Sequence, residues 1–214
     1  MYDIVLFDLD GTLIDSERGI TNCATYALSK FGIRIDDPLT LRPFIGPPLF
    51  DSFSKTYGFS DEDALKAVGY YREHFKEKGI YEFTLYNGIE ELLARLKSAG
   101  KTLILATSKY ELYAKQIISH LGFDKYFSLS VGSCKDGSRA AKAEVIAYAL
   151  ETYGVTDYSR AVMIGDRKHD IIGAKQVGID SIGVLYGFGT REELESHGAT
   201  YVARDTDEIL DIIG

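Results

Sequence analysis

Four aspartates follow short apolar runs in this 214-residue chain, and carboxylates gathered in this way can bind a divalent cation. Asp8 and Asp10 come directly after residues 4–7, a short β-branched and aromatic run typical of a central parallel strand buried on both faces. Asp166 follows a second such run, and Asp170 comes four residues later. Because the carboxyl ends of strands in an open α/β sheet face the ligand crevice, we predict one cation site there.

Asp8 and Asp10 have the spacing expected of a nucleophile and a proton-transfer group, and Gly11 permits the turn after them. Attack of Asp8 on phosphorus forms an aspartyl phosphate, while Asp10 protonates the leaving oxygen and later takes a proton from water. Since a carboxylate repels a phosphate, Mg²⁺ is needed to join Asp8, the phosphate and Asp166. We expect Asp10 to ligate the ion through its backbone carbonyl, and Asp170 to ligate it directly or through water. Either Asp8 or Asp10 alone would suit a turn cap, but the four carboxylates together do not.

Two further segments have the form of phosphate-binding elements. The predicted strand 102–106 ends at Thr107 and Ser108, at a strand-to-helix junction where backbone N–H groups favour anions. A hydroxyl residue at such a point is more often a simple helix cap. Lys142 precedes a helical pattern and can supply a fixed positive charge, although most lysines are solvated surface residues. Lys135 competes for this role from a loop, and the more rigid position favours Lys142.

The residues after about position 87 alternate strand-like and helix-like segments, the pattern of a parallel sheet built from βαβ units. Predicted strands span residues 4–7, 102–106, 126–131, 161–164 and 181–185. Three of the amphipathic stretches end at Gly100, Gly122 and Gly154, the usual left-handed helix stop. We therefore predict an α/β fold, with a Rossmann-like, doubly wound parallel sheet in a catalytic core of residues 1–15 and 87–214.

Residues 16–86 break this alternation and are predicted to form an all-helical inserted domain. One helical stripe ends at Gly32 and another at Gly79, the second with Ser60 and Asp63 as a capping pair. All four prolines of the chain lie between these stripes, which favours a stiff, turn-rich connection. A helical excursion packed on the sheet would explain this insert. A mobile cap over the crevice explains it better, because it directly follows the acidic motif.

In order and spacing, these motifs resemble the haloacid dehalogenase superfamily of phosphatases. The matching residues are Asp8-Leu9-Asp10-Gly11-Thr12, Thr107, Lys142 and the pattern from Gly165 and Asp166 to Asp170. The resemblance covers nearly the whole chain, and it places the insert like the small cap of the phosphoglycolate phosphatase subgroup. Further matches to that subgroup are Gly46-Pro47-Pro48-Leu49, Tyr86-Asn87-Gly88 and Tyr186-Gly187-Phe188-Gly189.

The resemblance implies a Mg²⁺-dependent phosphatase that hydrolyses a small soluble phosphate monoester, such as phosphoglycolate. Asp10 favours phosphoryl transfer, because the dehalogenating branch lacks a carboxylate there. The residue after Lys142 is Ala143, where many relatives have proline, so the identity of the third-motif lysine stays open. Alternatives are a 5'-nucleotidase, a phosphomutase resembling β-phosphoglucomutase and a non-enzymatic phosphoacceptor. Against the last stands Thr107, where a receiver domain would carry an aspartate.

The substrate-binding residues expected in the insert are Arg42, Gly46, Pro47 and Arg72. An arginine would suit a carboxylate such as that of phosphoglycolate, whereas aromatic cap residues would suit a nucleobase. Phosphate-binding residues are expected to be Gly11, Thr107 and Ser108.

Composition limits the partners. A formal net charge of -8 argues against nucleic acid, because binding to a phosphate backbone needs a basic face. No apolar run approaches the roughly 20 residues that span a bilayer, and no basic signal segment begins the chain. We therefore expect a cytoplasmic protein, a monomer or weak homodimer, that takes a small-molecule phosphate ester. Cys23 and Cys134 are expected to be free thiols.

Overall fold

The strand before Asp8 lies in the middle of the sheet. In the computed structural model, which describes residues 2–214, β1 (Ile4–Phe7) pairs in parallel with β4 (Thr102–Tyr110) on one side and β6 (Ala161–Gly165) on the other. Val5, Leu6 and Phe7 are fully buried, as expected of a strand covered on both faces. Phe7 is level with Leu105 and with Ile164, so the residues that follow these three lie at the same edge of the sheet.

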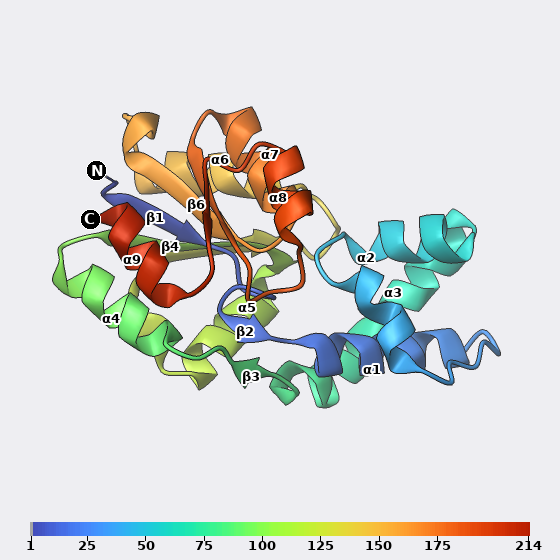
Figure 1. The fold of residues 1–214 in the computed structure, drawn as a ribbon. Helices are drawn as coiled ribbons and strands as arrows, with labels where there is room; N and C mark the ends of the chain where they lie inside the picture. The colour runs from blue at the N-terminus through green and yellow to red at the C-terminus, as the bar shows by residue number, and fades with distance from the viewer. Residues whose placement is uncertain (1) are drawn as a thin grey trace. The chain divides into compact units, whose positions relative to one another are not determined.

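Six parallel strands form the sheet, in the order β5-β4-β1-β6-β7-β8. The remaining three are β5 (Phe127–Ser133), β7 (Asp180–Val184) and β8 (Tyr201–Ala203). The helices of this unit are α4 (Ile89–Ser98), α5 (Glu111–His120), α6 (Lys142–Tyr153), α7 (Lys168–Val177), α8 (Arg191–Ser196) and α9 (Thr206–Ile213). Helices α6 and α7 pack on one face over a core of aliphatic side chains, and α4 and α5 cover the other face (Figure 1). The predicted α/β class is confirmed.

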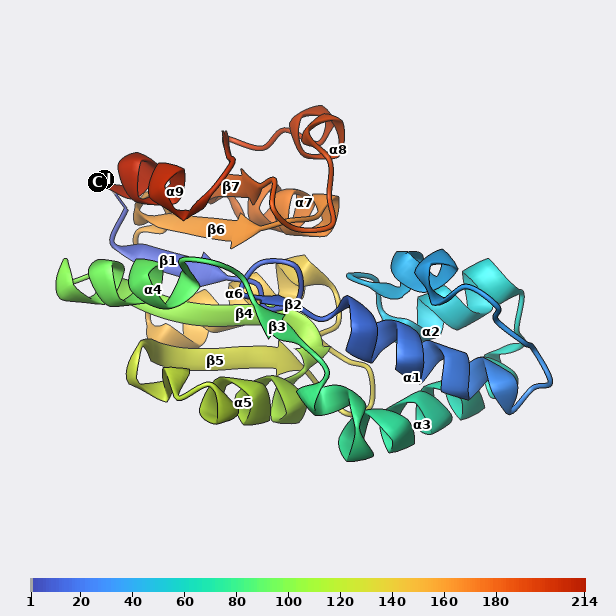
Figure 2. The same cartoon turned by 60° about the horizontal axis from the view of Figure 1, so that its bottom comes forward.

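The chain divides into two compact units, one of Met1–Ile14 with Leu85–Gly214 and the other of Asp15–Thr84. These divisions lie within two residues of the predicted ones at 15/16 and 86/87. The two connecting segments, β2 (Ile14–Asp15) and β3 (Thr84–Leu85), pair as a small sheet (Figure 2). That the second unit acts as a cap stays a prediction.

The second unit is built from helices. Its elements are α1 (Glu17–Ser29), a 3₁₀ segment (Pro38–Phe44), the short α2 (Leu49–Asp51), a π turn (Ser52–Thr56), α3 (Asp61–Glu77) and a 3₁₀ turn (Gly79–Tyr81). The predicted cap of α3 is confirmed, because the Ser60 hydroxyl accepts from the backbone N–H of Asp63 at 3.2 Å. Gly79, where this helical stripe was predicted to end, lies two residues after the last residue of α3. It is needed because a Cβ there would lie 2.4 Å from the Cys23 sulfur.

The largest differences from the predicted strands of the main sheet are at β4 and β8. β4 runs on to Tyr110, because Tyr110 still pairs with Ser133 of β5 after a register shift. Thr107 and Ser108 therefore lie inside a strand, and the expectation that they stand at a helix start is wrong, since α5 begins at Glu111. The edge strand β8 was not predicted, because three residues are too few to show the alternation of apolar and polar side chains that indicates a strand.

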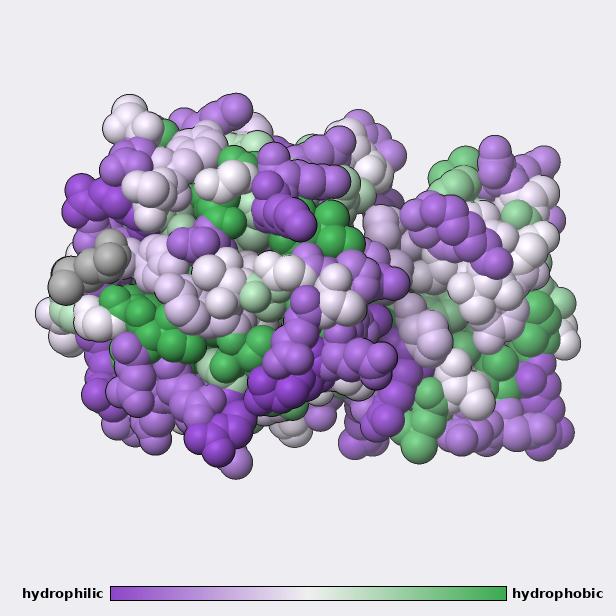
Figure 3. Space-filling view, turned by 45° about the horizontal axis from the view of Figure 1, so that its top comes forward, coloured by the Kyte–Doolittle hydropathy of each residue, from purple (hydrophilic) through white to green (hydrophobic). Residues whose placement is uncertain are grey.

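The visible surface is mostly polar, in contrast to the apolar core. In Figure 3, hydrophilic residues predominate on the visible face and hydrophobic residues form small separate groups. Among residues 2–214, no helix is both long enough and apolar enough to cross a membrane. Neither Cys23 nor Cys134 forms a disulfide among the residues described, as predicted.

Candidate active site

Asp8 stands at the point where β1 ends. Its backbone N–H donates to the carbonyl of Ile164 at 2.9 Å, which continues the strand pairing and fixes the backbone from which the carboxylate extends. The residue is 7% exposed. Burial raises the pKa of Asp8 from 3.8 to about 6, and the Asp170 carboxylate adds to this rise, whereas the Lys142 ammonium opposes it. That Asp8 is the nucleophile stays a prediction.

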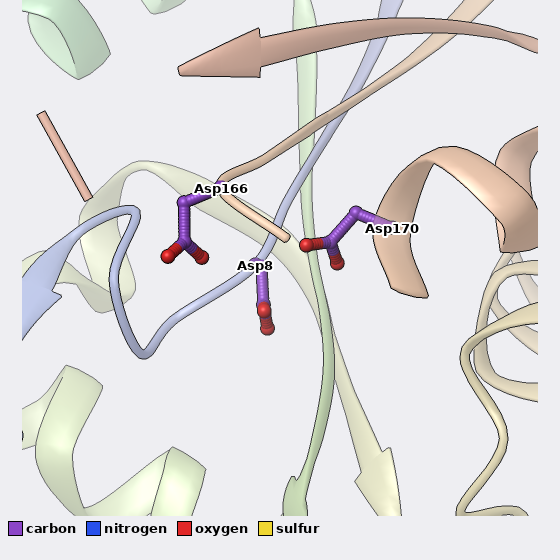
Figure 4. A group of neighbouring side chains, drawn as sticks. All are labelled: Asp8, Asp166 and Asp170. Carbon is purple, nitrogen blue, oxygen red and sulfur yellow. The ribbon is translucent and has the colours of Figure 1, made fainter. Parts of the chain in front are cut away.

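The three carboxylates that were predicted to hold a metal come together. Asp8, Asp166 and Asp170 each offer an oxygen, and these oxygens lie within 4.8 Å of one another. Figure 4 shows the origin of the three side chains: Asp8 after β1, Asp166 after β6, and Asp170 in the first turn of α7. Burial, and then the charges of Asp170 and Asp8, raise the pKa of Asp166 well above its usual range. Three buried acids at this spacing repel one another unless a cation or proton lies among them.

Lys142 supplies a positive charge to this cluster. Its Nζ lies 2.8 Å from Oδ1 of Asp8 and 2.9 Å from Oδ1 of Asp170, and it donates to the carbonyl of Ala106 at 3.2 Å. Burial alone would lower the pKa of this ammonium, but the two carboxylates outweigh it and raise the pKa. Lys135 is exposed in the loop between β5 and α6. The structure thus brings Lys142 to Asp8.

Glycines make room for the acidic side chains. A Cβ at Gly11 would lie 2.2 Å from the Asp166 carboxylate, and one at Gly165 would lie 2.2 Å from Cγ of Asp170. Gly187, in the loop after β7, would place a Cβ 2.4 Å from that of Asp166. The same loop binds Asp166 directly, because the backbone N–H of Phe188 donates to its Oδ2 at 2.8 Å. The loop after β7 therefore holds the Asp166 side chain, and the turn at Gly11 lies against it.

Asp10, predicted as the proton-transfer group, contacts a residue that the sequence analysis did not select. Lys109 Nζ lies 2.9 Å from both carboxylate oxygens of Asp10, and the two side chains are 9% and 13% exposed. The sequence carries one signal for this contact, because Lys109 directly follows Thr107 and Ser108. Asp10 does not join the carboxylate cluster that could hold a metal, among the residues described. Its predicted ligation through the backbone carbonyl stays a prediction.

The predicted phosphate-binding residues lie on the same unit as the carboxylates. Thr107 is buried, and its hydroxyl accepts from the backbone N–H of Lys109 at 3.2 Å. Ser108 is half-buried on β4. Gly11 has a left-handed φ of 82°, a conformation that glycine adopts at no steric cost. A phosphate-binding role for the three residues stays a prediction.

The predicted substrate-binding residues all lie in the helical unit. Arg42 is on the 3₁₀ segment, Gly46 and Pro47 follow that segment, and Arg72 is half-buried on α3. Arg42 forms an ion pair with Glu17 at 2.9 Å, so part of its charge is already compensated. A role for these residues in substrate binding stays a prediction.

Comparison with known proteins identifies the family of the chain. The model of the family described as haloacid dehalogenase-like hydrolase matches residues 5–184, a range that contains all the carboxylates and lysines described above. The chain belongs to this family. Its resemblance to haloacid dehalogenase-like phosphatases, first seen in the spacing of the motifs, is confirmed.

Relatives of this haloacid dehalogenase-like hydrolase carry more than one name. A 5'-nucleotidase from Pseudomonas aeruginosa is 43% identical over 212 residues, which cover 99% of this chain and 96% of that protein. The tyrosine-protein kinase PtkA from Mycobacterium tuberculosis is 37% identical, over 99% of this chain and 72% of that protein. The crystal structure of a predicted phosphatase from Clostridium acetobutylicum is 47% identical, with a TM-score of 0.97 over 100% of this chain and 98% of that one. The chain is a haloacid dehalogenase-like phosphatase, an enzyme acting on phosphate esters.

Proposed function

We propose that this phosphatase hydrolyses small soluble phosphate monoesters, with Mg²⁺, through an aspartyl phosphate on Asp8. The observation that carries the proposal is the buried Asp8 carboxylate, which has the Lys142 ammonium at 2.8 Å and two further carboxylates beside it. An anion can approach such a nucleophile only if cations offset its charge. The buried lysine supports that part of the mechanism, and the acid cluster supports a metal.

The cluster fits a hard divalent cation. Oδ1 of Asp8 and Oδ1 of Asp170 are buried and accept no hydrogen bond from the described residues, although the Lys142 ammonium is close to both. Carboxylate oxygens are hard ligands of the kind that Mg²⁺ takes in proteins. We propose that Asp8, Asp166 and Asp170 hold the ion, with the Asp10 carbonyl completing this set. When bound, Mg²⁺ would neutralise charge on the phosphoryl oxygens and on the carboxylates around them.

The proposed reaction has two steps. In the first, an Asp8 oxygen forms a bond to phosphorus as the ester P–O bond breaks, and Asp10 gives its proton to the leaving oxygen. In the second, the Asp10 carboxylate takes a proton from water while the water oxygen attacks phosphorus. The Asp8–phosphorus bond breaks, and inorganic phosphate leaves. Lys142 stays protonated throughout, and its role is to stabilise the negative charge that builds up on the phosphoryl group.

We propose nucleoside monophosphates as the substrate class to test first. The relative named 5'-nucleotidase supports this choice, since it matches over nearly its whole length. The Arg42–Glu17 ion pair also weakens the case for phosphoglycolate, because Arg42 was expected to bind the substrate carboxylate. Phosphoglycolate, the preference drawn from the sequence, remains the second compound.

The deciding experiment measures phosphate release from nucleoside 5'-monophosphates, phosphoglycolate, sugar phosphates and pyrophosphate, with Mg²⁺ and with EDTA. We expect Mg²⁺-dependent release that the Asp8→Asn variant loses, with a nucleoside monophosphate giving the highest kcat/KM. Asp15→Asn is the matched control, because Asp15 lies on β2 in the second unit. Phosphate release that persists in the Asp8→Asn variant would overturn the assignment of Asp8 as the nucleophile. Conversion of a sugar 1-phosphate to its 6-phosphate would show a mutase, and transfer from ATP to a tyrosine peptide would show a kinase.

A further inference from the structure

Asp10 is held by a lysine that no step of the proposed mechanism uses. Lys109 Nζ is 2.9 Å from Oδ1 and 2.9 Å from Oδ2 of Asp10, so one ammonium spans both oxygens. The two residues are 99 positions apart and belong to neighbouring parallel strands, since Asp10 lies just beyond β1 and Lys109 lies in β4. An ion pair that spans both oxygens restricts rotation of the carboxylate.

The backbone on each side of this pair is fixed. At Lys109, the N–H is bound to the Thr107 hydroxyl, and the carbonyl lies so close to β5 that a Cβ on Gly132 would be 2.5 Å from it. After Asp10, the backbone N–H groups of Leu13 and Ile14 both donate to the carbonyl of Leu9, which closes the turn around the aspartate. With both backbones anchored, the Lys109 ammonium reaches the Asp10 carboxylate from a defined side.

From this geometry we infer that Lys109 is a positioning residue that holds the Asp10 carboxylate in the orientation needed for proton transfer. The inference rests on the proposed role of Asp10, because it assigns Lys109 no chemistry of its own. A proton-transfer group works only within hydrogen-bond reach of the atom that it serves, and a misplacement of about 1 Å can cost on the order of 100-fold in rate. Lys109 would then act on kcat/KM through Asp10.

A direct contact between Lys109 and the phosphate is the competing explanation, and the leaving group separates the two. Hydrolysis of an alkyl phosphate needs a proton on the departing oxygen, whereas 2,4-dinitrophenolate departs without one. If Lys109 positions Asp10, Lys109→Met lowers kcat/KM for the alkyl ester, because kcat/KM reports the step in which the leaving oxygen is protonated, and changes kcat/KM for 2,4-dinitrophenyl phosphate much less. If Lys109 binds phosphate, both substrates and the inhibition constant of inorganic phosphate change alike.

The experiment is a double-mutant cycle of Lys109→Met with Asp10→Asn, measured on both substrates at saturating Mg²⁺. We expect Lys109→Met to lower kcat/KM for the alkyl ester by about 10- to 100-fold in the wild-type background, within the range of a general acid. In the Asp10→Asn background we expect a change of less than about twofold, since residues that act as a unit are not additive. Lys97→Met, at an exposed lysine on α4, is the control for loss of a surface charge.

Each failure points to a different error. An undiminished alkyl-ester kcat/KM in Asp10→Asn would remove the proposed role of Asp10, and with it the basis of the inference. A loss in Asp10→Asn without one in Lys109→Met would overturn the inference alone. An equal loss from Lys109→Met in both backgrounds would also overturn it and would assign Lys109 to the phosphate. Melting curves of each variant, with and without Mg²⁺, show whether a loss of rate reflects unfolding.

Discussion

Replacing Lys142 with methionine removes the one ammonium that contacts two buried carboxylates of the metal cluster among the residues described. Breaking a buried ion pair from one side costs about 3–5 kcal/mol, because the remaining charge has no partner. Protonation limits this cost. A carboxyl with an ordinary pKa of 3.8 can be neutralised at about 1.36 kcal/mol for each pH unit above that value. The destabilisation from one unpaired carboxyl is therefore limited to about 4 kcal/mol at pH 7 and about 2 kcal/mol at pH 5.

The sign of the pH dependence follows from the direction of the shift. Because the pKa of Asp8 is raised in the folded protein, the native state binds more protons than the unfolded state between pH 3.8 and about 6, and stability falls as pH rises through that window. In Lys142→Met the pKa of Asp8 rises further, so the loss continues to higher pH. A difference of about 4 kcal/mol corresponds to a melting temperature about 8–16 °C lower for a chain of this size.

The assay is thermal unfolding in EDTA at pH 5 and pH 7, followed by a Mg²⁺ titration. Lys101→Met is the matched control, because Lys101 is also 6% exposed but donates to the carbonyl of Tyr2, and no carboxylate loses a cation in this variant. We expect the loss in Lys142→Met to be larger at pH 7 than at pH 5. We also expect Mg²⁺ to raise its melting temperature more than that of the wild type. Equal losses in the two variants at both pH values would refute this account of the cluster.

Three further predictions concern the same site. Asp8→Asn should lose kcat/KM by several orders of magnitude with its circular dichroism spectrum unchanged, because it removes a covalent catalyst. Asp166→Asn should abolish the rise in melting temperature on adding Mg²⁺, which differential scanning calorimetry measures; an undiminished rise would place the ion elsewhere. Gly187→Ala should lower stability by about 1–3 kcal/mol in urea unfolding, because its Cβ would overlap Asp166, and should weaken Mg²⁺ binding in isothermal titration. Gly69→Ala is its control, since a Cβ there meets no atom within 4 Å.

The acidic residues could be found from the sequence because they follow strong local signals. Asp8 and Asp166 each end an apolar run of a central strand, and parallel strands bring their ends to one edge of the sheet. The spacing of apolar residues along the chain, and the position of the aspartates after the strands, were enough to predict the fold class and this cluster. Lys142 followed from its place at the first residue of α6.

The contacts between distant segments could not be predicted in this way. The length of β4 depends on a register shift against β5, which no local pattern encodes. For the same reason, the partnership of Lys109 with Asp10 needs the β1–β4 register, and the bond from Phe188 to Asp166 needs the path of the loop after β7. The sequence showed Gly187 only as part of a family match, whereas the structure shows the carboxylate side chain that excludes a Cβ there.

The order of the strands has a consequence for synthesis on the ribosome. β1 is made first, yet both of its neighbours follow the whole of the second unit, since β4 begins at Thr102 and β6 at Ala161. At about 5–20 residues per second, some 8–30 s pass between the synthesis of β1 and that of β6. During this time residues 15–84 can fold around their own contacts, while the apolar strand that carries Asp8 has no complete sheet to join. Folding of the catalytic unit is therefore expected to be late and dominated by non-local contacts, so the nascent chain has the greatest need of chaperones before β6 emerges.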